Sequence, residues 1–108
     1  MTQVFILRYD RTFVSKLIRK IRGEETTSSI TLDEISFSFV KKGQEINIPY
    51  VNVTRLRRYH SSDDGESLII YVDNKKIKEF FAYQFENGQK FALFKKTLID
   101  ACTIAEKD

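Results

Sequence analysis

The 108-residue sequence contains no tryptophan and a single cysteine, proline, histidine and methionine. One cysteine, Cys102, excludes an internal disulfide and a zinc site made from several cysteines. Neither a Pro/Gly/Ser-rich linker nor an internal repeat divides the chain, so we expect one domain over residues 1–108. No apolar run reaches the roughly 18 residues that a membrane span needs. The first residues also lack a basic segment followed by an apolar one, so we expect a cytoplasmic protein.

Aromatic side chains are abundant, with nine phenylalanines and five tyrosines in a chain that is 42% hydrophobic and 31% charged. This composition is typical of a globular domain with an aromatic core. Eighteen basic and fifteen acidic residues give a formal charge of only +3. Because a dedicated DNA-binding domain is usually more basic, any anion binding has to come from local clusters of charge.

The N-terminal part of the sequence predicts a strand over 3–9 and then a helix over 11–22. Asp10 is a suitable N-cap for that helix, and Gly23 is a suitable end. A basic amphipathic helix either packs on a sheet or lies on an anionic partner, and both interpretations stay open. Its apolar stripe comprises Phe13, Val14, Leu17, Ile18 and Ile21, and its basic residues are Arg11, Lys16, Arg19, Lys20 and Arg22.

Residues 28–85 then follow a period of two, which predicts consecutive antiparallel strands joined by short turns. Ile35 is placed in a strand with Phe37 and Phe39, and Pro49 is expected to end the next strand. Further strands are predicted over 53–60, 67–72 and 77–85. Turns are predicted at 33–34, 41–44, 61–66 and 73–75.

A second helix is predicted over 88–106, with Asn87 as its N-cap. Spacings of three and four residues place one apolar stripe on this helix, and we expect the stripe to pack on the sheet. The fold class is therefore mainly β (α+β), with a bent antiparallel sheet or barrel of about six or seven strands and a C-terminal helix across it. The stripe consists of Phe91, Phe94, Leu98 and Cys102.

Residues 30–39 (ITLDEISFSF), the turn 41–44 (KKGQ) and residues 46–53 (INIPYVNV) together resemble a bacterial pleckstrin-homology-like domain. The resemblance covers about residues 30–106. It implies a strongly bent antiparallel barrel, closed at one end by the C-terminal helix, that acts as a non-enzymatic binding or scaffold module. The family's phosphoinositide signature requires more basic residues at the first hairpin than Lys41 and Lys42. The strand 3–9 and the helix 11–22 depart from the minimal domain. Some membrane-associated relatives carry transmembrane hairpins at the place where this sequence predicts the amphipathic helix.

Basic residues of the strand 54–60 and of the following hairpin form the candidate ligand site. Arg55 and Arg57 share one face of a strand, so their guanidinium groups are placed to bind a phosphate or a carboxylate. Acidic residues near them, above all Asp73 and Glu79, are candidate internal partners that would neutralise this patch. The complete candidate set is Arg55, Arg57, Arg58, Lys75, Lys76 and Lys78.

Catalysis has little support in the sequence. His60 is the single histidine and has no nucleophile or acid partner defined by spacing. Cys102 lies on an apolar helix stripe, and Asp63 and Asp64 lie in a predicted turn. We therefore expect a non-enzymatic module, without metal or cofactor, that binds a protein partner or associates with itself. The alternative is binding of nucleic acid or anionic lipid through the strand 54–60 and the helix 11–22.

Overall fold

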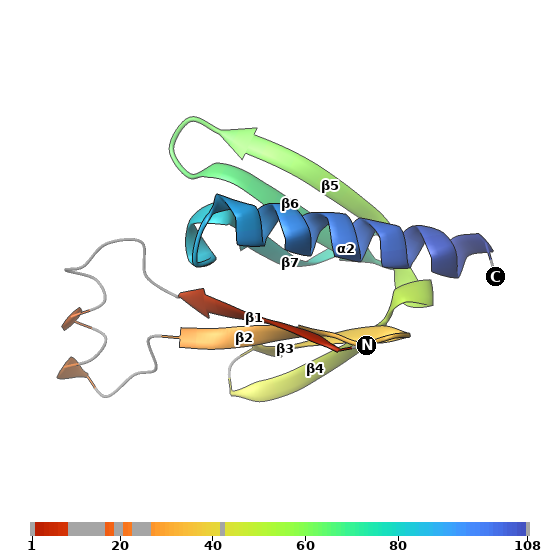
Figure 1. The fold of residues 1–108 in the computed structure, drawn as a ribbon, viewed down its shortest axis with the longest axis horizontal. Helices are drawn as coiled ribbons and strands as arrows, with labels where there is room; N and C mark the ends of the chain where they lie inside the picture. The colour runs from red at the N-terminus through yellow and green to blue at the C-terminus, as the bar shows by residue number, and fades with distance from the viewer. Residues whose placement is uncertain (1, 9–16, 19–20, 23–26, 42, 108) are drawn as a thin grey trace.

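The computed structural model describes residues 2–8, 17–18, 21–22, 27–41 and 43–107. Two antiparallel sheets and one long helix make up the fold (Figure 1). The first sheet holds β1 (Gln3–Arg8), β2 (Thr27–Leu32), β3 (Ser36–Lys41) and β4 (Gln44–Pro49), in that order. The second sheet holds β5 (Val53–Ser61), β6 (Gly65–Val72) and β7 (Lys75–Phe81), and the helix is α2 (Gly88–Lys107).

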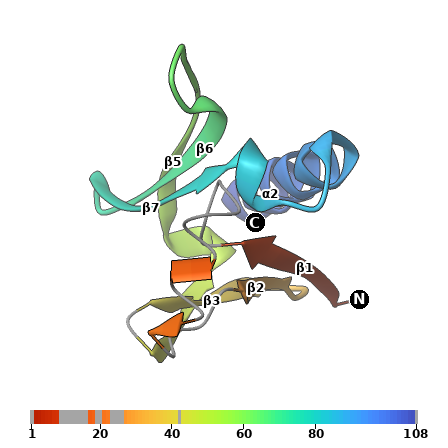
Figure 2. The same cartoon turned by 90° about the vertical axis from the view of Figure 1, so that its left-hand side faces the viewer.

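The seven strands confirm the expected mainly β class, but they do not form one closed barrel. The chain leaves the first sheet at Pro49 and enters the second through a single 3-10 turn, Tyr50–Asn52. A proline at this point cannot extend the ladder, which explains why the strand ends where the sequence predicts. The helix α2 covers one side of the space between the sheets, and the β6–β7 turn lies on the opposite side (Figure 2).

Two tight turns place the strands in register. Asp73 and Asn74 connect β6 to β7 with φ angles of 54° and 62°, the left-handed pair that a two-residue hairpin of type I′ requires. Gly43 in the β3–β4 turn has a φ of 78°, which favours glycine. Both turns were predicted from the sequence.

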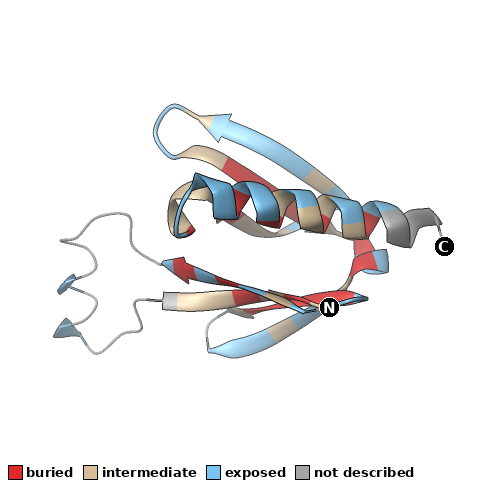
Figure 3. Ribbon diagram, in the orientation of Figure 1, coloured by how far each residue is buried: buried red, intermediate tan, exposed pale blue. Residues whose placement is uncertain are grey.

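The helix α2 begins as predicted, because the Asn87 side-chain oxygen accepts a hydrogen bond from the Lys90 amide at 2.8 Å. All four residues of its predicted stripe are buried, which confirms the expected packing. Burial is concentrated on the sides of the sheets and helix that face one another, whereas β5 is largely exposed (Figure 3). Several phenylalanine rings join the helix to both sheets, among them Phe5, Phe80, Phe85 and Phe94.

Two predicted strand boundaries were wrong. Ile35 is 79% exposed in a turn before β3, because the Asp33 amide donates to the Ser36 carbonyl oxygen and closes the chain on itself. The strand predicted over 77–85 ends at Phe81, where the Gln84 side-chain oxygen accepts the Phe81 amide at 2.9 Å. A 3-10 turn follows, and it still delivers Phe85 into the core.

The predicted helix over 11–22 lies mostly outside the described residues. Its described apolar members, Leu17, Ile18 and Ile21, are 46%, 46% and 76% exposed. These three side chains therefore do not pack in the core in the way that the sheet-packing interpretation requires. No helix in the described part of the chain is long and apolar enough to cross a membrane.

The Tyr50 hydroxyl ties the junction between the sheets to the β2–β3 turn. It donates a 2.7 Å hydrogen bond to the Asp33 carbonyl oxygen, and its ring stacks on Phe37 at a centroid distance of 6.0 Å. Burial raises the pKa of Tyr50 to about 12, and the charges of Cys102 and Asp33 add to the effect. We expect Tyr50→Phe to lower the free energy of unfolding by about 1 kcal/mol at neutral pH, since the ring stays and one hydrogen bond is lost.

Tyr50→Phe should also change how the free energy of unfolding depends on pH. The folded-state pKa of Tyr50 lies above the ordinary tyrosine value of about 10, so its contribution is complete below pH ~10 and is lost as the pH rises towards 12. Urea unfolding from pH 8 to 12 should therefore show the wild type losing more stability than Tyr50→Phe. Parallel curves for the two proteins would contradict this assignment.

Candidate functional site

The six basic residues singled out by the sequence lie on β5 and β7, and β6 separates these two strands. Their register divides them between the two faces of the second sheet. On the outer face, Arg55 lies opposite Tyr71, which in turn lies opposite Lys76. Arg57 lies on the same face, opposite Ile69.

The other three basic residues lie on the opposite face of the sheet, which carries the core. Lys78 pairs with Ile70, and Lys75 pairs with Val72. Arg58 pairs with Leu68 and is exposed at the side chain. An irregularity in the β6–β7 register at Ile70/Tyr71 separates the two sets, because it breaks the simple alternation of faces between Lys76 and Lys78. The six basic residues that the sequence grouped as one candidate site therefore lie on two distinct surfaces.

Arg55 and Arg57 contact aromatic rings on the outer face. The Arg55 guanidinium carbon lies 5.5 Å from the centroid of the Tyr71 ring, and that of Arg57 lies 5.3 Å from the centroid of Tyr59. Both arginines are exposed and Tyr59 is 42% exposed, whereas Leu56 between the arginines is partly buried on the core. Stacking of this kind fixes the planar guanidinium groups without using their hydrogen-bond donors.

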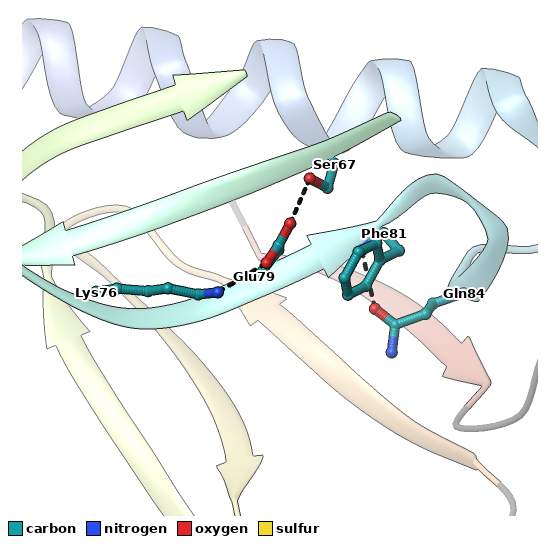
Figure 4. A network of polar contacts seen from close by, with 5 residues as sticks. All are labelled: Ser67, Lys76, Glu79, Phe81 and Gln84. Carbon is teal, nitrogen blue, oxygen red and sulfur yellow. Dashed lines mark hydrogen bonds and ion pairs between the residues drawn. The ribbon is translucent and has the colours of Figure 1, made fainter. Parts of the chain in front are cut away.

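The internal neutralisation expected for these arginines is not found among the described residues. Glu79 accepts a hydrogen bond from the Ser67 hydroxyl at 2.7 Å and pairs with Lys76 at 2.8 Å (Figure 4). No carboxylate of the described chain lies within 4.0 Å of Arg55 or Arg57, and this includes Asp73. Among the described residues, no acceptor therefore takes up the hydrogen-bond donors of these two guanidinium groups.

Glu79 keeps its charge on this face. Burial alone would raise its pKa. The hydrogen bonds from Lys76 and Ser67 and the charge of Lys76 together lower the pKa by more than burial raises it, so the pKa lies below its ordinary value. Ser67 is fully buried between β5 and β7 although it lies on the outer face. The outer face therefore carries fixed charges of both signs.

A second feature is a groove of about 390 Å³ between the first and second sheets. Residues of β4 line it on one side, and residues of the β6–β7 hairpin line it on the other. Its walls are mainly apolar, with lysines around them. The lining consists of Phe39, Lys41, Ile46, Asn47, Ile48, Pro49, Asn52, Val72, Lys75, Lys76 and Ile77.

Lys78 adjoins this groove from the core face of β7. Its ammonium group lies 6.0 Å from the centroid of Phe39 and 5.6 Å from the centroid of Phe80. Burial lowers the pKa of Lys78, and the nearby charge of Lys41 lowers it further. A half-buried cation held over two aromatic rings is placed to attract an anion into the groove.

The residues considered for catalysis do not come together. His60 is exposed on β5, and no side chain among the described residues forms a hydrogen bond with it. Cys102 is buried in the core, as its helical stripe predicts. Asp63 and Asp64 lie in the β5–β6 turn, where the Asp64 amide donates to the Ser61 hydroxyl at 2.9 Å. No group of three potential metal ligands occurs within the described ranges.

Two contributors to these surfaces were not assigned to the candidate site from the sequence. Tyr71 stacks with Arg55, and Lys41 lines the groove together with Lys75. The alternation over 67–72 indicates that Tyr71 faces away from Leu68 and Ile70, but it does not reveal which strand lies opposite. No protein-family model, curated protein or solved structure matches this chain. Both surfaces are therefore defined by the geometry of this chain alone.

Proposed function

We propose that this protein is a non-enzymatic binding module of pleckstrin-homology-like type that recognises another protein through the outer face of its second sheet. The observation that carries the proposal is the pair of exposed arginines, Arg55 and Arg57, stacked on Tyr71 and Tyr59. Arginine and tyrosine are enriched among the residues that contribute most to protein–protein affinity. Stacking also reduces the side-chain entropy that binding would otherwise remove.

The arrangement of the strands supports the pleckstrin-homology-like part of the proposal. Over residues 30–106, consecutive antiparallel strands are followed by a C-terminal helix that covers the space between the two sheets. This order agrees with the resemblance, whereas β1 lies outside it and the sheets do not close into the implied barrel. A module of this kind places its ligand on a surface that a rigid β framework holds in position.

A second candidate function is binding of nucleic acid or anionic lipid by the same arginines. Guanidinium groups beside aromatic rings suit single-stranded nucleic acid, in which bases stack and phosphates pair with cations. Two observations favour a protein partner. The formal charge is only +3, and the ionised Glu79 lies on the same face as Arg55 and Arg57. A negative charge on that face repels a phosphate backbone, whereas a mixed-charge protein surface can pair with it.

The double substitution Arg55→Glu/Arg57→Glu tests this assignment. We expect immobilised wild type to retain a protein partner from an extract of its source cells at both about 50 mM and 200 mM salt, and the double variant to lose it. Labelled single- and double-stranded oligonucleotides should bind weakly to both proteins. The matched control is Lys90→Glu/Lys96→Glu, which makes the same charge change at exposed positions of α2.

Two results would contradict the protein-binding function. One is tight oligonucleotide or anionic-vesicle binding that falls steeply between about 50 mM and 200 mM salt and disappears in Arg55→Glu/Arg57→Glu, which would support the second candidate. The other is a protein partner that both double variants retain equally, which would place the interface elsewhere. Circular dichroism of each variant confirms that the fold is intact.

A further inference from the structure

We propose that the groove between β4 and the β6–β7 hairpin is a second binding site, which takes an extended peptide segment whose groove-facing side chains are apolar and acidic. The segment would pair with β4 as a fifth strand of the first sheet. This site is separate from the outer face that carries Arg55 and Arg57, and the proposal does not depend on that face. Three features of the groove support it: its course along a strand edge, its apolar walls and its surplus of positive charge.

The groove follows the edge of β4. Four consecutive residues of this strand, 46–49, line the groove. Neighbouring residues of a strand point to opposite faces of its sheet, so a cavity over one face would touch alternate residues only. Contact with consecutive residues instead places the groove along the strand's edge, and β4 is the last strand of the first sheet.

The register of β4 shows which backbone groups that edge presents. Lys41 and Gln44 are the last register partners before the β3–β4 turn, and the Tyr50 amide donates to the Ile35 carbonyl oxygen at the other end of the same ladder, which puts Lys41 and Gln44 in the hydrogen-bonded series. Because hydrogen-bonded and non-hydrogen-bonded pairs alternate in an antiparallel ladder, the amides of Glu45 and Asn47 point away from β3. Pro49 falls in the same series, where its missing N–H leaves the ladder intact. Outside the regular ladders, no described backbone bond uses Glu45 or Asn47.

The walls of the groove suit the apolar side chains of an added strand. Ile46 and Ile48 come from β4, Val72 and Ile77 come from the opposite hairpin, and Phe39 contributes its ring. A strand that pairs with β4 directs every second side chain towards these residues. Its backbone satisfies the free edge of β4, while its apolar side chains fill the volume between the sheets.

The groove-facing side chains of the bound strand also include acidic residues, because the lysines of the groove lie on the same side as its apolar walls. Lys41 and Lys75 line the groove, and Lys78 adjoins it through the Phe39 ring. No described carboxylate forms an ion pair with any of these three, whereas Lys76 is already paired with Glu79. Charge complementarity therefore favours a partner with carboxylates, and lysines at the edge discourage pairing with a second copy of the same basic edge.

The probe is a labelled peptide of about eight residues with threonine at every second position and with valine and glutamate in turn at the positions between, so that one face carries both; edge strands have about this length. We expect saturable binding by fluorescence anisotropy, and at least about tenfold weaker binding of the same peptide with lysine in place of glutamate. Bound peptide should slow amide hydrogen exchange at Glu45 and Asn47 by at least about tenfold. The amides of Ile46 and Ile48, which already face β3, should change much less.

The variant Lys41→Glu/Lys75→Glu changes two exposed side chains, and we expect it to weaken peptide binding at least about tenfold. Lys90→Glu/Lys96→Glu is the matched control and should bind as the wild type does. Arg55→Glu/Arg57→Glu should also bind normally, which separates this site from the outer face. The proposal is overturned if the acidic peptide does not bind, if the peptide with lysine in place of glutamate binds equally well, or if Glu45 and Asn47 gain no protection at saturation.

Discussion

Replacing Phe94 with alanine is expected to lower the free energy of unfolding by about 3–5 kcal/mol, the usual range for removing a buried phenylalanine ring. Phe94 is fully buried on α2, and its ring lies between the two sheets. Its centroid is 5.6 Å from that of Phe5 on β1, 5.3 Å from that of Phe80 on β7 and 4.9 Å from that of Phe85. Loss of the ring therefore leaves a cavity that several rigid elements surround and cannot fill by a small local movement.

Urea denaturation of the wild type and of Phe94→Ala measures this loss. The control is Leu93→Ala, because Leu93 is the preceding residue of the same helix and is 47% exposed. We expect the control to change stability by no more than about 0.5 kcal/mol. A loss below about 1 kcal/mol at Phe94 would mean that α2 does not join the two sheets in the way the structure shows.

The second large effect is expected at Glu79, where alanine should cost about 2–3 kcal/mol. Its carboxylate accepts hydrogen bonds from the Ser67 hydroxyl and from Lys76, and bonds to a charged group contribute more than neutral ones. Ser67 is fully buried, so removal of the carboxylate leaves its hydroxyl without a partner. That unsatisfied group adds to the cost.

A double-mutant cycle with Ser67→Ala and Glu79→Ala isolates this interaction. We expect a coupling of at least about 0.5 kcal/mol between the two substitutions, whereas simple additivity would contradict the hydrogen bond. Acid provides an independent check. Because the folded-state pKa of Glu79 is lowered, its contribution is present above the ordinary pKa of about 4.3 and is lost as the pH falls through the folded value. The stability difference between wild type and Glu79→Ala should therefore shrink in acid.

The two surfaces proposed for binding place different demands on stability. On the outer face, the Ser67–Glu79–Lys76 network satisfies the buried polar groups and leaves Arg55 and Arg57 available. In the groove, Lys78 is a half-buried cation without a carboxylate partner among the described residues. Burial of an unpaired charge costs free energy, so an anion bound beside Lys78 would offset part of that cost.

Patterns of a few residues determined much of this fold. The helix α2, its Asn87 cap and its buried stripe follow from spacings of three and four residues within one segment. The hairpin at residues 73–74 and the end of β4 at Pro49 follow from the conformations that single residues prefer. The two-residue period of a strand likewise predicted that Arg55 and Arg57 share one face. These features depend on interactions between near neighbours in the chain, which the sequence displays directly.

The hydrophobic period was insufficient where a competing hydrogen bond decided the path of the chain. The Gln84 side chain ends β7 at Phe81, and the Asp33–Ser36 turn exposes Ile35, although both segments alternate like strands. A bond from one side chain or one turn changes the chain's path without altering its hydrophobic period. The assignment of Glu79 to Lys76 and Ser67 depended in the same way on strand register.

The tertiary structure alone decided how the basic residues are used. The sequence grouped six cations from β5 and the β6–β7 hairpin, but the strand register, with its irregularity at Ile70/Tyr71, places three on each face of the second sheet. The tertiary structure also separates the strands into two sheets and leaves the edge of β4 beside the lysines of β7. Neighbouring residues reveal which face a side chain takes, whereas the opposing strand and the space between two sheets depend on contacts across the whole chain.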